Sequence, residues 1–436
     1  MNYSKRIKEC ENSAINAWAE GRAVTKAGPW LVYIGTTNVC NNRCVVCAHH
    51  TSMRQERGFM GFETFKRIAD QLPASVKKVY LMKQGEPFAN KQLETFSEYL
   101  NKKRPDIHIG IHTNGILMKK ERLAKLLPHI HSLGVSISAI SASVYEKVHG
   151  TRSFDKVVEN LKGVSDLLQS LEKGKRPHVF VDYVRQSGND VEKEAEVVAF
   201  HRERFPGIAS IDFHSVFNFQ GEIEEGNLNV YNKLESRYFP CCVFPWGAMT
   251  FCHDGKLSYC FVEPRENRFL GDIRRQSFRT LWNNAESQVF RKRMHAKKFA
   301  DLAKDGFYCH KCSWLWNLQS QSPRNLSVGY SLQQQLGLSE ARFADVLESS
   351  PDRLFDAGVE AYLKGEIHQA LGLFEVLASR GEPEKITTAA KKGTALCRKA
   401  LQRYRDLARA QKLLVRESSR SLKTRNTYYK LMGNDG

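Results

Sequence analysis

The stretch WLVYIGTTNVCNNRCVVCAHH, residues 30–50, decides the fold of this chain. It opens with a short apolar run rich in residues that favour strands, so it predicts a buried β-strand. Directly after this strand come Cys40, Cys44 and Cys47, spaced as Cys-x3-Cys-x2-Cys. Thiolates this close together can bind three corners of an iron–sulfur cluster. A fourth corner is then left for another group to fill.

Zinc is the alternative metal for the same three cysteines. A structural zinc ion accepts this spacing but requires four ligands from the protein. His49 or His50, which follow the last cysteine closely, could supply the fourth. The motif taken alone therefore leaves iron–sulfur and zinc chemistry both open.

The length and composition indicate a globular protein of two or three domains. The chain has 436 residues, of which 42% are hydrophobic and 26% are charged. It contains no run of about 18 apolar residues and no signal-peptide pattern, so we expect no membrane span and a cytoplasmic location. Eleven cysteines in that reducing compartment indicate metal binding or catalysis rather than disulfides. The net charge of +19 favours an anionic partner.

From residue 30 to residue 216, short apolar runs alternate with amphipathic segments. This alternation is typical of parallel strands joined by crossover helices, so we expect an α/β fold. Six such units predict a partial (β/α)6 TIM-like barrel that does not close. The predicted strands are 30–36, 77–83, 106–113, 133–138, 178–184 and 209–216.

Composition shifts along the chain predict its domains. The expected order is an N-terminal helical extension (1–29), the partial barrel (30–216), a linker (217–240), a small cysteine-bearing domain (241–316), a second linker (317–345) and a basic all-α C-terminal region (346–436). Within the last, residues 354–381 resemble one tetratricopeptide unit. A single unit cannot bury a solenoid core alone, so we expect a packed helical appendage first and a site for a protein partner second.

Two further motifs follow the next two predicted strands. Gln-Gly-Glu-Pro occupies residues 84–87, and His-Thr-Asn-Gly occupies residues 112–115. In TIM-like folds the chemistry lies at the carboxyl ends of the strands, where both motifs fall. Together with the three cysteines, they resemble the radical S-adenosylmethionine (radical SAM) superfamily. The resemblance implies a [4Fe-4S] cluster on Cys40, Cys44 and Cys47, with S-adenosylmethionine on the fourth iron and cleaved there to a 5'-deoxyadenosyl radical.

The same resemblance implies residues that bind the cofactor. Gly85 and Glu86 match the motif that holds the methionine amino group, Pro87 would fix the turn, and Gln84 stands where relatives have another glycine. An ammonium group needs carbonyl or carboxylate acceptors, which agrees with this role.

Other positions of the resemblance lie on the third and fourth strands. Thr113 and Asn114 match a motif near the cofactor, and Ser136 matches a serine that contacts the ribose. Val46 replaces the usual aromatic residue before the last cluster cysteine. Ser138, where many relatives have aspartate, removes a carboxylate from the substrate side and puts any transfer of substrate from those relatives in doubt.

The second cysteine-bearing region resembles the SPASM/Twitch extension of radical SAM enzymes. It contains Cys-x-x-Pro-Trp, an Asp-Gly turn, Leu-Gly-Asp-Ile and a final Cys-x-x-Cys. The resemblance implies the short Twitch form, with one auxiliary [4Fe-4S] cluster on Cys242, Cys260, Cys309 and Cys312. Four thiolates suit a structural zinc ion equally well, so zinc stays the alternative.

Cys241 and Cys252 remain near this second site. A thiol in a radical enzyme can return a hydrogen atom to a substrate radical, as radical epimerases do. Cys252 is the first candidate for that role and Cys241 the second. The alternative is that each is a small buried hydrophobic residue.

These features predict a radical SAM enzyme that oxidises or epimerises a small, polar, sugar-like metabolite, with an external electron donor such as flavodoxin or ferredoxin. The alternative is a maturase of a ribosomally made peptide, with the C-terminal helices holding a leader or partner. Two non-enzymatic alternatives are an iron–sulfur electron carrier, which does not explain Gly85-Glu86-Pro87, and a zinc-stabilised nucleic-acid binder using the basic tail. We expect no nucleic-acid partner, since that tail lacks a pattern of stacking aromatics.

Overall fold

The computed structural model describes residues 20–172, 174, 176–224, 242–312, 350–363 and 386–397, with a few single residues at 10–18 and 370–377. The chain divides into two compact units, Met1–Ser331 and Leu332–Gly436. Linker residues 225–240, the second linker 317–345 and most of the basic tail lie outside the described residues, as does Cys241.

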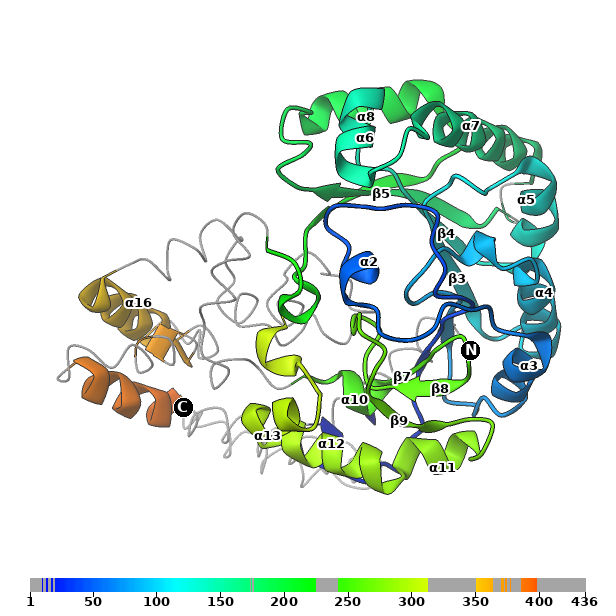
Figure 1. Cartoon of the computed structure of the whole chain (residues 1–436). Coiled ribbons are helices and arrows are strands. Elements are labelled where there is room, and N and C mark those ends of the chain that lie inside the picture. The colour runs from blue at the N-terminus through cyan, green and yellow to red at the C-terminus, as the bar shows by residue number, and fades with distance from the viewer. Residues whose placement is uncertain are drawn as a thin grey trace, which may run out of the picture. The chain divides into compact units, whose positions relative to one another are not determined.

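Six parallel strands form most of the sheet in the first unit. They are β1 (Leu31–Ile34), β2 (Lys78–Tyr80), β3 (His108–Thr113), β4 (Ser132–Ser136), β5 (His178–Arg185) and β6 (Ser210–Ser215). They lie side by side in chain order, and each pair is parallel. The sheet curves without closing (Figure 1), so the prediction of a partial barrel is confirmed.

Helices cover the outer side of the curved sheet (Figure 1). They are α3 (Phe62–Asp70), α4 (Leu93–Lys103), α5 (Lys120–Leu126), α7 (Phe154–Ser170) and α8 (Glu194–Arg204). Alternate strand residues such as Val79, Ile109, Leu133 and Val181 face these helices and are wholly buried. The predicted crossover helices are thus present. The sequence reading missed α2 (His49–Ser52) and α6 (Ala142–His149).

The sheet continues from the barrel into the second cysteine-bearing region. Strand β7 (Ala248–Phe251) pairs with β1 in parallel, and β8 (Lys256–Ser258) and β9 (Phe269–Asp272) follow antiparallel. The turn between β7 and β8 is the predicted Asp-Gly turn, where Gly255 adopts a φ of +84°. Strands of the barrel and of the auxiliary region therefore share one sheet, and the predicted domain boundaries stay a prediction.

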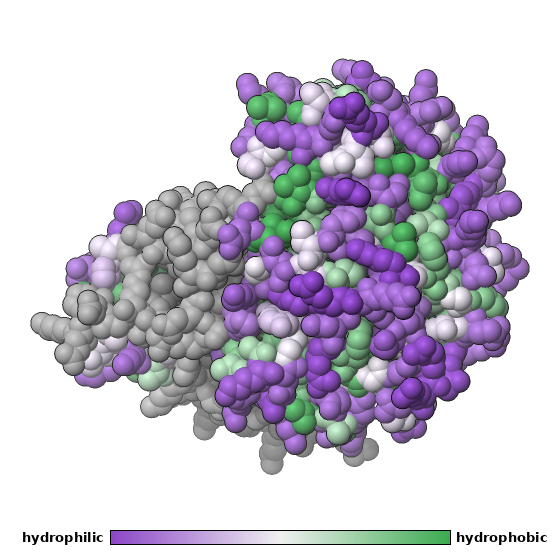
Figure 2. Space-filling model, viewed as in Figure 1, coloured by the Kyte–Doolittle hydropathy of each residue, from purple (hydrophilic) through white to green (hydrophobic). Residues whose placement is uncertain are grey.

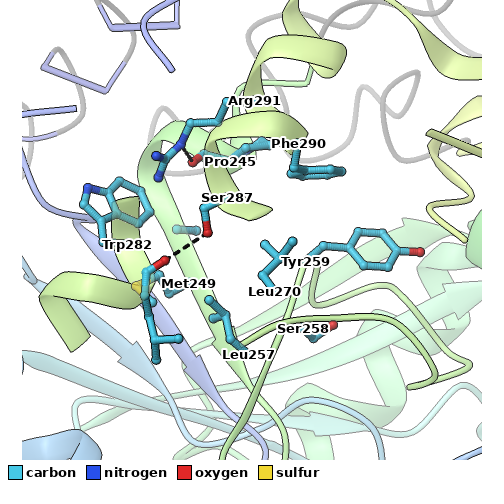
Figure 3. Close-up of a pocket in the computed structure, with 12 residues that line it drawn as sticks. Pro245, Met249, Leu257, Ser258, Tyr259, Leu270, Trp282, Ser287, Phe290 and Arg291 are labelled. Carbon is cyan, nitrogen blue, oxygen red and sulfur yellow. Dashed lines mark hydrogen bonds between the residues drawn. The ribbon is translucent and has the colours of Figure 1, made fainter. Parts of the chain in front are cut away.

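Short helices pack on this extension of the sheet: α10 (Phe244–Gly247), α11 (Phe278–Asn283), α12 (Ala285–His295) and α13 (Phe299–Lys304). Figure 3 shows Arg291 of α12 reaching into their core beside Trp282 and Pro245. Its Nε donates to the Pro245 carbonyl at 2.8 Å, and its Nη1 donates to the Ala23 carbonyl and to Asn283 Oδ1 at 3.0 Å each. Burial lowers the pKa of Arg291 to about 9. The Arg291 guanidinium therefore connects three segments of the chain, those around Ala23, Pro245 and Asn283.

The N-terminal segment packs against the same region. The Trp246 indole donates to the Arg22 carbonyl at 2.7 Å, and the Trp282 indole donates to the Ala27 carbonyl at 2.9 Å. Ala14, one of the helical residues described before residue 20, belongs to a buried core with Trp30. The N-terminal segment thus helps to hold the auxiliary region against the barrel.

In the second unit, helix α16 (Pro351–Leu363) matches the first half of the tetratricopeptide-like stretch. Phe374 is buried, and a Cβ added to Gly358 or Gly393 would lie within 2.8 Å of its ring. Helical residues from both sides therefore approach one phenylalanine closely, as in a packed helical appendage.

The face of the first unit that Figure 2 shows is largely hydrophilic. Within the described residues, no helix combines the length and the apolar character that a membrane crossing needs. Figure 2 shows hydrophilic residues predominating along the outer helices, with hydrophobic residues only in scattered groups.

Replacing Arg291 tests whether it holds the auxiliary region together. We expect Arg291→Met to destabilise the first unit by about 2–5 kcal/mol, because buried acceptors lose their donors. Thermal unfolding followed by circular dichroism measures this. Arg293→Met is the matched control, since Arg293 lies on the same helix and pairs with Asp305 at the surface. Equal shifts for both variants would contradict the role.

Candidate active site

The three cysteines of the first motif lie on one loop between β1 and α2. The Cys47 N–H donates to the Cys44 carbonyl at 3.2 Å, which folds the loop into a tight turn. Burial raises the pKa of Cys40 to about 11, and burial together with Cys47 and Cys40 raises the pKa of Cys44 further. Buried thiols that suppress each other's ionisation become thiolates when a cation binds among them. The loop therefore suits an iron–sulfur cluster.

His49 and His50, the alternative zinc ligands, are engaged elsewhere. His49 Nε2 lies 2.7 Å from the Asn38 carbonyl oxygen and also contacts the Arg57 guanidinium, and His50 Nε2 contacts the Asn42 carbonyl. Burial lowers the pKa of His49 to about 4. Both rings thus serve the folding of the loop.

The Gly85–Glu86 loop lies directly against the cysteine loop. Gly85 has a φ of +99°, and a Cβ there would lie within 3.0 Å of the Thr37 carbonyl, the Asn38 Cα and the Val39 carbonyl. The next N–H, that of Glu86, donates to the Val39 carbonyl at 2.9 Å. Only glycine allows the two loops to approach this closely.

The carboxylate of Glu86 joins the second and third strand ends. Its Oε1 accepts from the Phe88 N–H at 3.0 Å and from Thr113 Oγ1 at 2.6 Å, and its Oε2 accepts from the Asn114 N–H at 2.7 Å. Pro87 begins the short helix η1 (Pro87–Ala89) that this carboxylate caps. A carboxylate oxygen can accept two bonds, so Oε2 retains capacity for one further donor.

The remaining predicted cofactor residues surround the same point. Asn114 Nδ2 donates to Asn41 Oδ1 at 2.8 Å and lies 3.9 Å from Cys40 Sγ. Gln84 is buried beside the Glu263 carbonyl, and Ser136 is half-buried at the end of β4. The structure thus brings the first two motifs and Asn114 to one place. Their contacts with the cofactor stay predictions.

A buried ion pair connects the Gln84–Pro87 loop with the auxiliary region. Lys83 Nζ lies 2.8 Å from Glu266 Oε1 and donates to the Glu263 carbonyl at 3.0 Å. Burial opposes the charge of Lys83, but Glu266, Cys252 and Glu263 outweigh it and hold the lysine pKa above its usual range. Asn38 Nδ2 donates to the other oxygen of Glu266 at 3.3 Å.

The four predicted auxiliary cysteines, Cys242, Cys260, Cys309 and Cys312, line one pocket. Cys309 and Cys312 belong to the turn around η6 (Cys309–Lys311), where the Cys312 N–H donates to the Cys309 carbonyl at 3.2 Å. Burial raises the pKa of Cys309 well above its ordinary value, and the other three thiols raise it further. Four thiols gathered in an apolar pocket have the composition that a [4Fe-4S] cluster requires.

Cys252, the first candidate for a hydrogen donor, lies at the end of β7 and is wholly buried. Burial and Glu266 raise the pKa of its thiol well above the ordinary value. The sulfur therefore keeps its hydrogen, which a hydrogen-atom donor needs. Its role stays a prediction, as does that of Cys241.

A row of polar side chains lines the inner face of the sheet. On this face His112 of β3, Asp182 of β5 and His214 of β6 follow the alternation and register of the strands. His112 Nδ1 lies 2.7 Å from Asp182 Oδ2, and His214 Nε2 lies 3.0 Å from Asp182 Oδ1. Because a carboxylate only accepts, both of these ring nitrogens carry hydrogen.

These three side chains are partly accessible to solvent, the two histidines more so than Asp182. The side chains of His112 and His214 are 29% and 37% exposed, while that of Asp182 is 10% exposed. Burial by itself raises the pKa of Asp182, but the two histidines outweigh it and hold the pKa below its usual range. Conversely, Asp182 holds the pKa of His214 above about 6.5 despite burial.

Comparison with protein families accounts for both cysteine sets. The radical SAM superfamily matches residues 34–170, and the SPASM iron-sulfur cluster-binding domain matches residues 241–313. The chain is a radical SAM protein with a SPASM domain. These families imply S-adenosylmethionine, the [4Fe-4S] cluster that binds it, and an auxiliary [4Fe-4S] cluster, which favours iron–sulfur over zinc at both sites.

Individual relatives of this radical SAM protein are distant. It is 24% identical over 299 residues to the antilisterial bacteriocin subtilosin biosynthesis protein AlbA of Bacillus subtilis (strain 168), covering 63% of this chain and 65% of that protein. It is 22% identical over 311 residues to the AdoMet-dependent heme synthase of Methanosarcina barkeri, covering 62% and 86%.

A solved structure shares the fold of this radical SAM protein. Streptococcus suis SuiB bound to precursor peptide SuiA has a TM-score of 0.50 and 15% identity, covering 64% of this chain and 70% of that chain.

Sequence reasoning missed three residues of the site. Asp182 and His214 lie on predicted strands, and the two-residue alternation of those strands could have placed them on the inner face. His149 contacts Cys44 across 105 residues of sequence, and no pattern in the sequence marks that contact.

Replacing Gly85 tests the close approach of the two loops. We expect Gly85→Ala to weaken S-adenosylmethionine binding about tenfold or more, because a strained φ and a backbone clash displace Glu86. Isothermal titration calorimetry under anaerobic conditions measures the affinity. Gly61→Ala is the control, since a Cβ at Gly61 meets nothing within 4 Å. A normal affinity in Gly85→Ala would show that the loops tolerate separation.

Iron analysis tests the two cysteine sets. Anaerobic reconstitution should give about eight iron atoms per chain, four for each cluster. Replacing Cys40, Cys44 and Cys47 by Ala should leave about four, and so should replacing Cys309 and Cys312 by Ala. Cys397→Ala, in the second unit, should retain all the iron. About four iron atoms in the unmodified protein would refute a second cluster.

Proposed function

We propose that this radical SAM enzyme oxidises or epimerises a small, polar, sugar-like substrate bound on the inner face of the barrel. When bound, the cofactors supply a 5'-deoxyadenosyl radical that removes a hydrogen atom from carbon, and an auxiliary cluster that can exchange an electron. The observation that carries the proposal is Asp182 held between His112 and His214 on this half-open face.

The two histidines can handle the proton of a substrate hydroxyl. Asp182 accepts from Nδ1 of His112 and from Nε2 of His214, so in each neutral ring the other nitrogen has the lone pair. That nitrogen can accept a hydroxyl proton while the carboxylate orients the ring and stabilises the resulting charge. Oxidation of an alcohol requires removal of that proton besides the hydrogen atom on carbon and one electron.

The position of Ser136 supports substrate binding at this face. Ser136 and Asp182 are register partners on β4 and β5. The serine matches the ribose contact of the superfamily, so the cofactor's ribose and the His112–Asp182–His214 group would lie on adjacent strands. Hydrogen transfer requires a short distance from the cofactor to the reacting carbon, and a substrate held by this group would lie next to the strand that carries the ribose contact.

In an epimerisation, a thiol would return a hydrogen atom to the substrate radical, and that radical would not lose the further electron that oxidation requires. Cys252 is the candidate in the described residues, and its neutral thiol can return hydrogen to a substrate radical. Solvent deuterium in the product would indicate this outcome, because a thiol exchanges with water. Oxidation introduces no solvent hydrogen on the carbon.

Peptide modification is the second candidate function. It is favoured by the relatives, since AlbA is a bacteriocin biosynthesis protein and the SuiB structure holds a precursor peptide. In that case the second unit, with its packed α16, would offer a surface for a peptide or protein partner. In either case we propose a cytoplasmic enzyme reduced by a flavodoxin or ferredoxin.

Replacing Asp182 tests its proposed support of the two histidine bases. We expect Asp182→Asn to lower substrate turnover by about 10²–10⁴-fold while uncoupled release of 5'-deoxyadenosine continues. The assay follows deuterium transfer from labelled sugars into 5'-deoxyadenosine, with Asp166→Asn on the exposed face of α7 as the control. Loss of both activities together would indicate a structural role instead.

The pH profile gives an independent check. Because Asp182 raises the pKa of His214, the neutral ring becomes available only as the pH rises through that raised value. The acid limb of kcat/KM should therefore lie above pH 6.5, and Asp182→Asn should move it to lower pH. A limb that does not move would exclude His214 as the base.

A further inference from the structure

We propose that His149 is a positioning residue of the S-adenosylmethionine-binding cluster: its Nδ1–H donates a hydrogen bond to the sulfur of Cys44 and so raises the reduction potential of that cluster. The inference concerns the cluster alone and is independent of which substrate the enzyme takes.

The hydrogen-bond partners of His149 fix its tautomer. Nδ1 lies 3.3 Å from Cys44 Sγ, and Nε2 lies 3.0 Å from the backbone nitrogen of Ser138. A backbone N–H can only donate, so Nε2 must offer its lone pair. In the neutral ring the hydrogen is then on Nδ1, which faces the sulfur.

Surrounding contacts hold the ring in place. His149 is the last residue of α6 and is 4% exposed, and its ring lies 4.4 Å from that of Tyr145 between centroids. The residue after it, Gly150, has a φ of +67°, and a Cβ there would lie 2.5 Å from the Arg43 carbonyl oxygen. The helix end and the cysteine loop therefore meet without space for another side chain.

Backbone hydrogen bonds hold the helix end to the cysteine loop. The Arg43 N–H donates to the His149 carbonyl at 3.2 Å, and the Val45 N–H donates to the Val148 carbonyl at 3.1 Å. These carbonyls belong to the last turn of α6, where a helix has no internal donors for them. Both residues flank Cys44, so the sulfur is held at a fixed distance from the histidine.

Besides donating its N–H to His149, Ser138 stabilises this arrangement through its hydroxyl and carbonyl groups. Its Oγ accepts from the Val184 N–H at 3.0 Å, and its carbonyl accepts from Asn189 Nδ2 at 2.9 Å. The segment after β4 is therefore fixed by strand β5 and the loop beyond it. This is the position at which many relatives have an aspartate, and here it supports the histidine.

The direction of the effect follows from charge. Reducing the cluster adds one negative charge, which is spread over the sulfur ligands. A hydrogen-bond donor stabilises the more negative state more strongly, so it raises the reduction potential.

Redox titration of the reconstituted full-length protein tests the proposal. Electron paramagnetic resonance identifies the relevant cluster by its response to S-adenosylmethionine. His149→Phe keeps a ring against Tyr145 but has no donor, so its midpoint potential should shift to a more negative value. His149→Gln, which retains an N–H, should restore part of the shift. His201→Phe is the control, since His201 is buried on α8 among Phe200 and Phe205.

The result that would overturn the proposal is an unchanged potential in His149→Phe, or an equal shift in His201→Phe. If His149→Phe does not assemble the cluster, pulsed electron paramagnetic resonance of the unmodified protein with ¹⁵N-labelled histidine tests the contact between His149 and the cluster. A weak coupling that His149→Gln abolishes supports a hydrogen bond. A strong coupling would show direct ligation of iron, and no coupling would show no contact; both refute the proposal.

Discussion

The arrangement of both cysteine sites depends on the buried ion pair between Lys83 and Glu266. The Lys83 ammonium lies between Glu266 and Glu263, which follow the predicted auxiliary ligand Cys260, while the lysine itself directly precedes the Gln84–Pro87 motif. The side chains of Lys83 and Glu266 are at most 2% exposed, so neither charge has water to replace its partner. Removing one partner of such a pair typically costs about 3–5 kcal/mol. The pair therefore specifies one relative position for the two loops.

The central strand gives the same two sites a common foundation. Strand β1 leads into the loop of the three predicted cluster cysteines and has β2 on one side and β7 on the other, both parallel to it. Tyr33 of β1 stacks on Phe261, next to Cys260, with ring centroids 4.5 Å apart, and on Tyr80 of β2 at 5.2 Å. Stacked rings thus connect β1 and β2 with the auxiliary pocket, which Phe261 lines.

Much of the fold was predictable because its signals are local. Short apolar runs mark the six strands, and the motifs follow the first three of them. The first cysteine set was predictable for the same reason, since three cysteines within eight residues must lie close in space, whereas the second set, spread from Cys242 to Cys312, followed only from the SPASM/Twitch resemblance. Helix α6 was missed, although it brings His149 to the cluster loop. The continuity of β1 with β7 was also missed, because a pairing across more than 200 residues leaves no periodic trace in the sequence.

The sequence by itself determined which chemistry this protein can hold, through three cysteines on one loop, four more in the SPASM region and the Gly85-Glu86-Pro87 motif. The tertiary structure decided how those groups are tuned. It placed His149 on Cys44, Lys83 on Glu266 and Asp182 beside His112, contacts that span 105, 183 and 70 residues. Hydrogen bonds and ion pairs act over a few ångströms, so their partners are fixed by the packing of strands and helices and by no feature of the sequence near either residue.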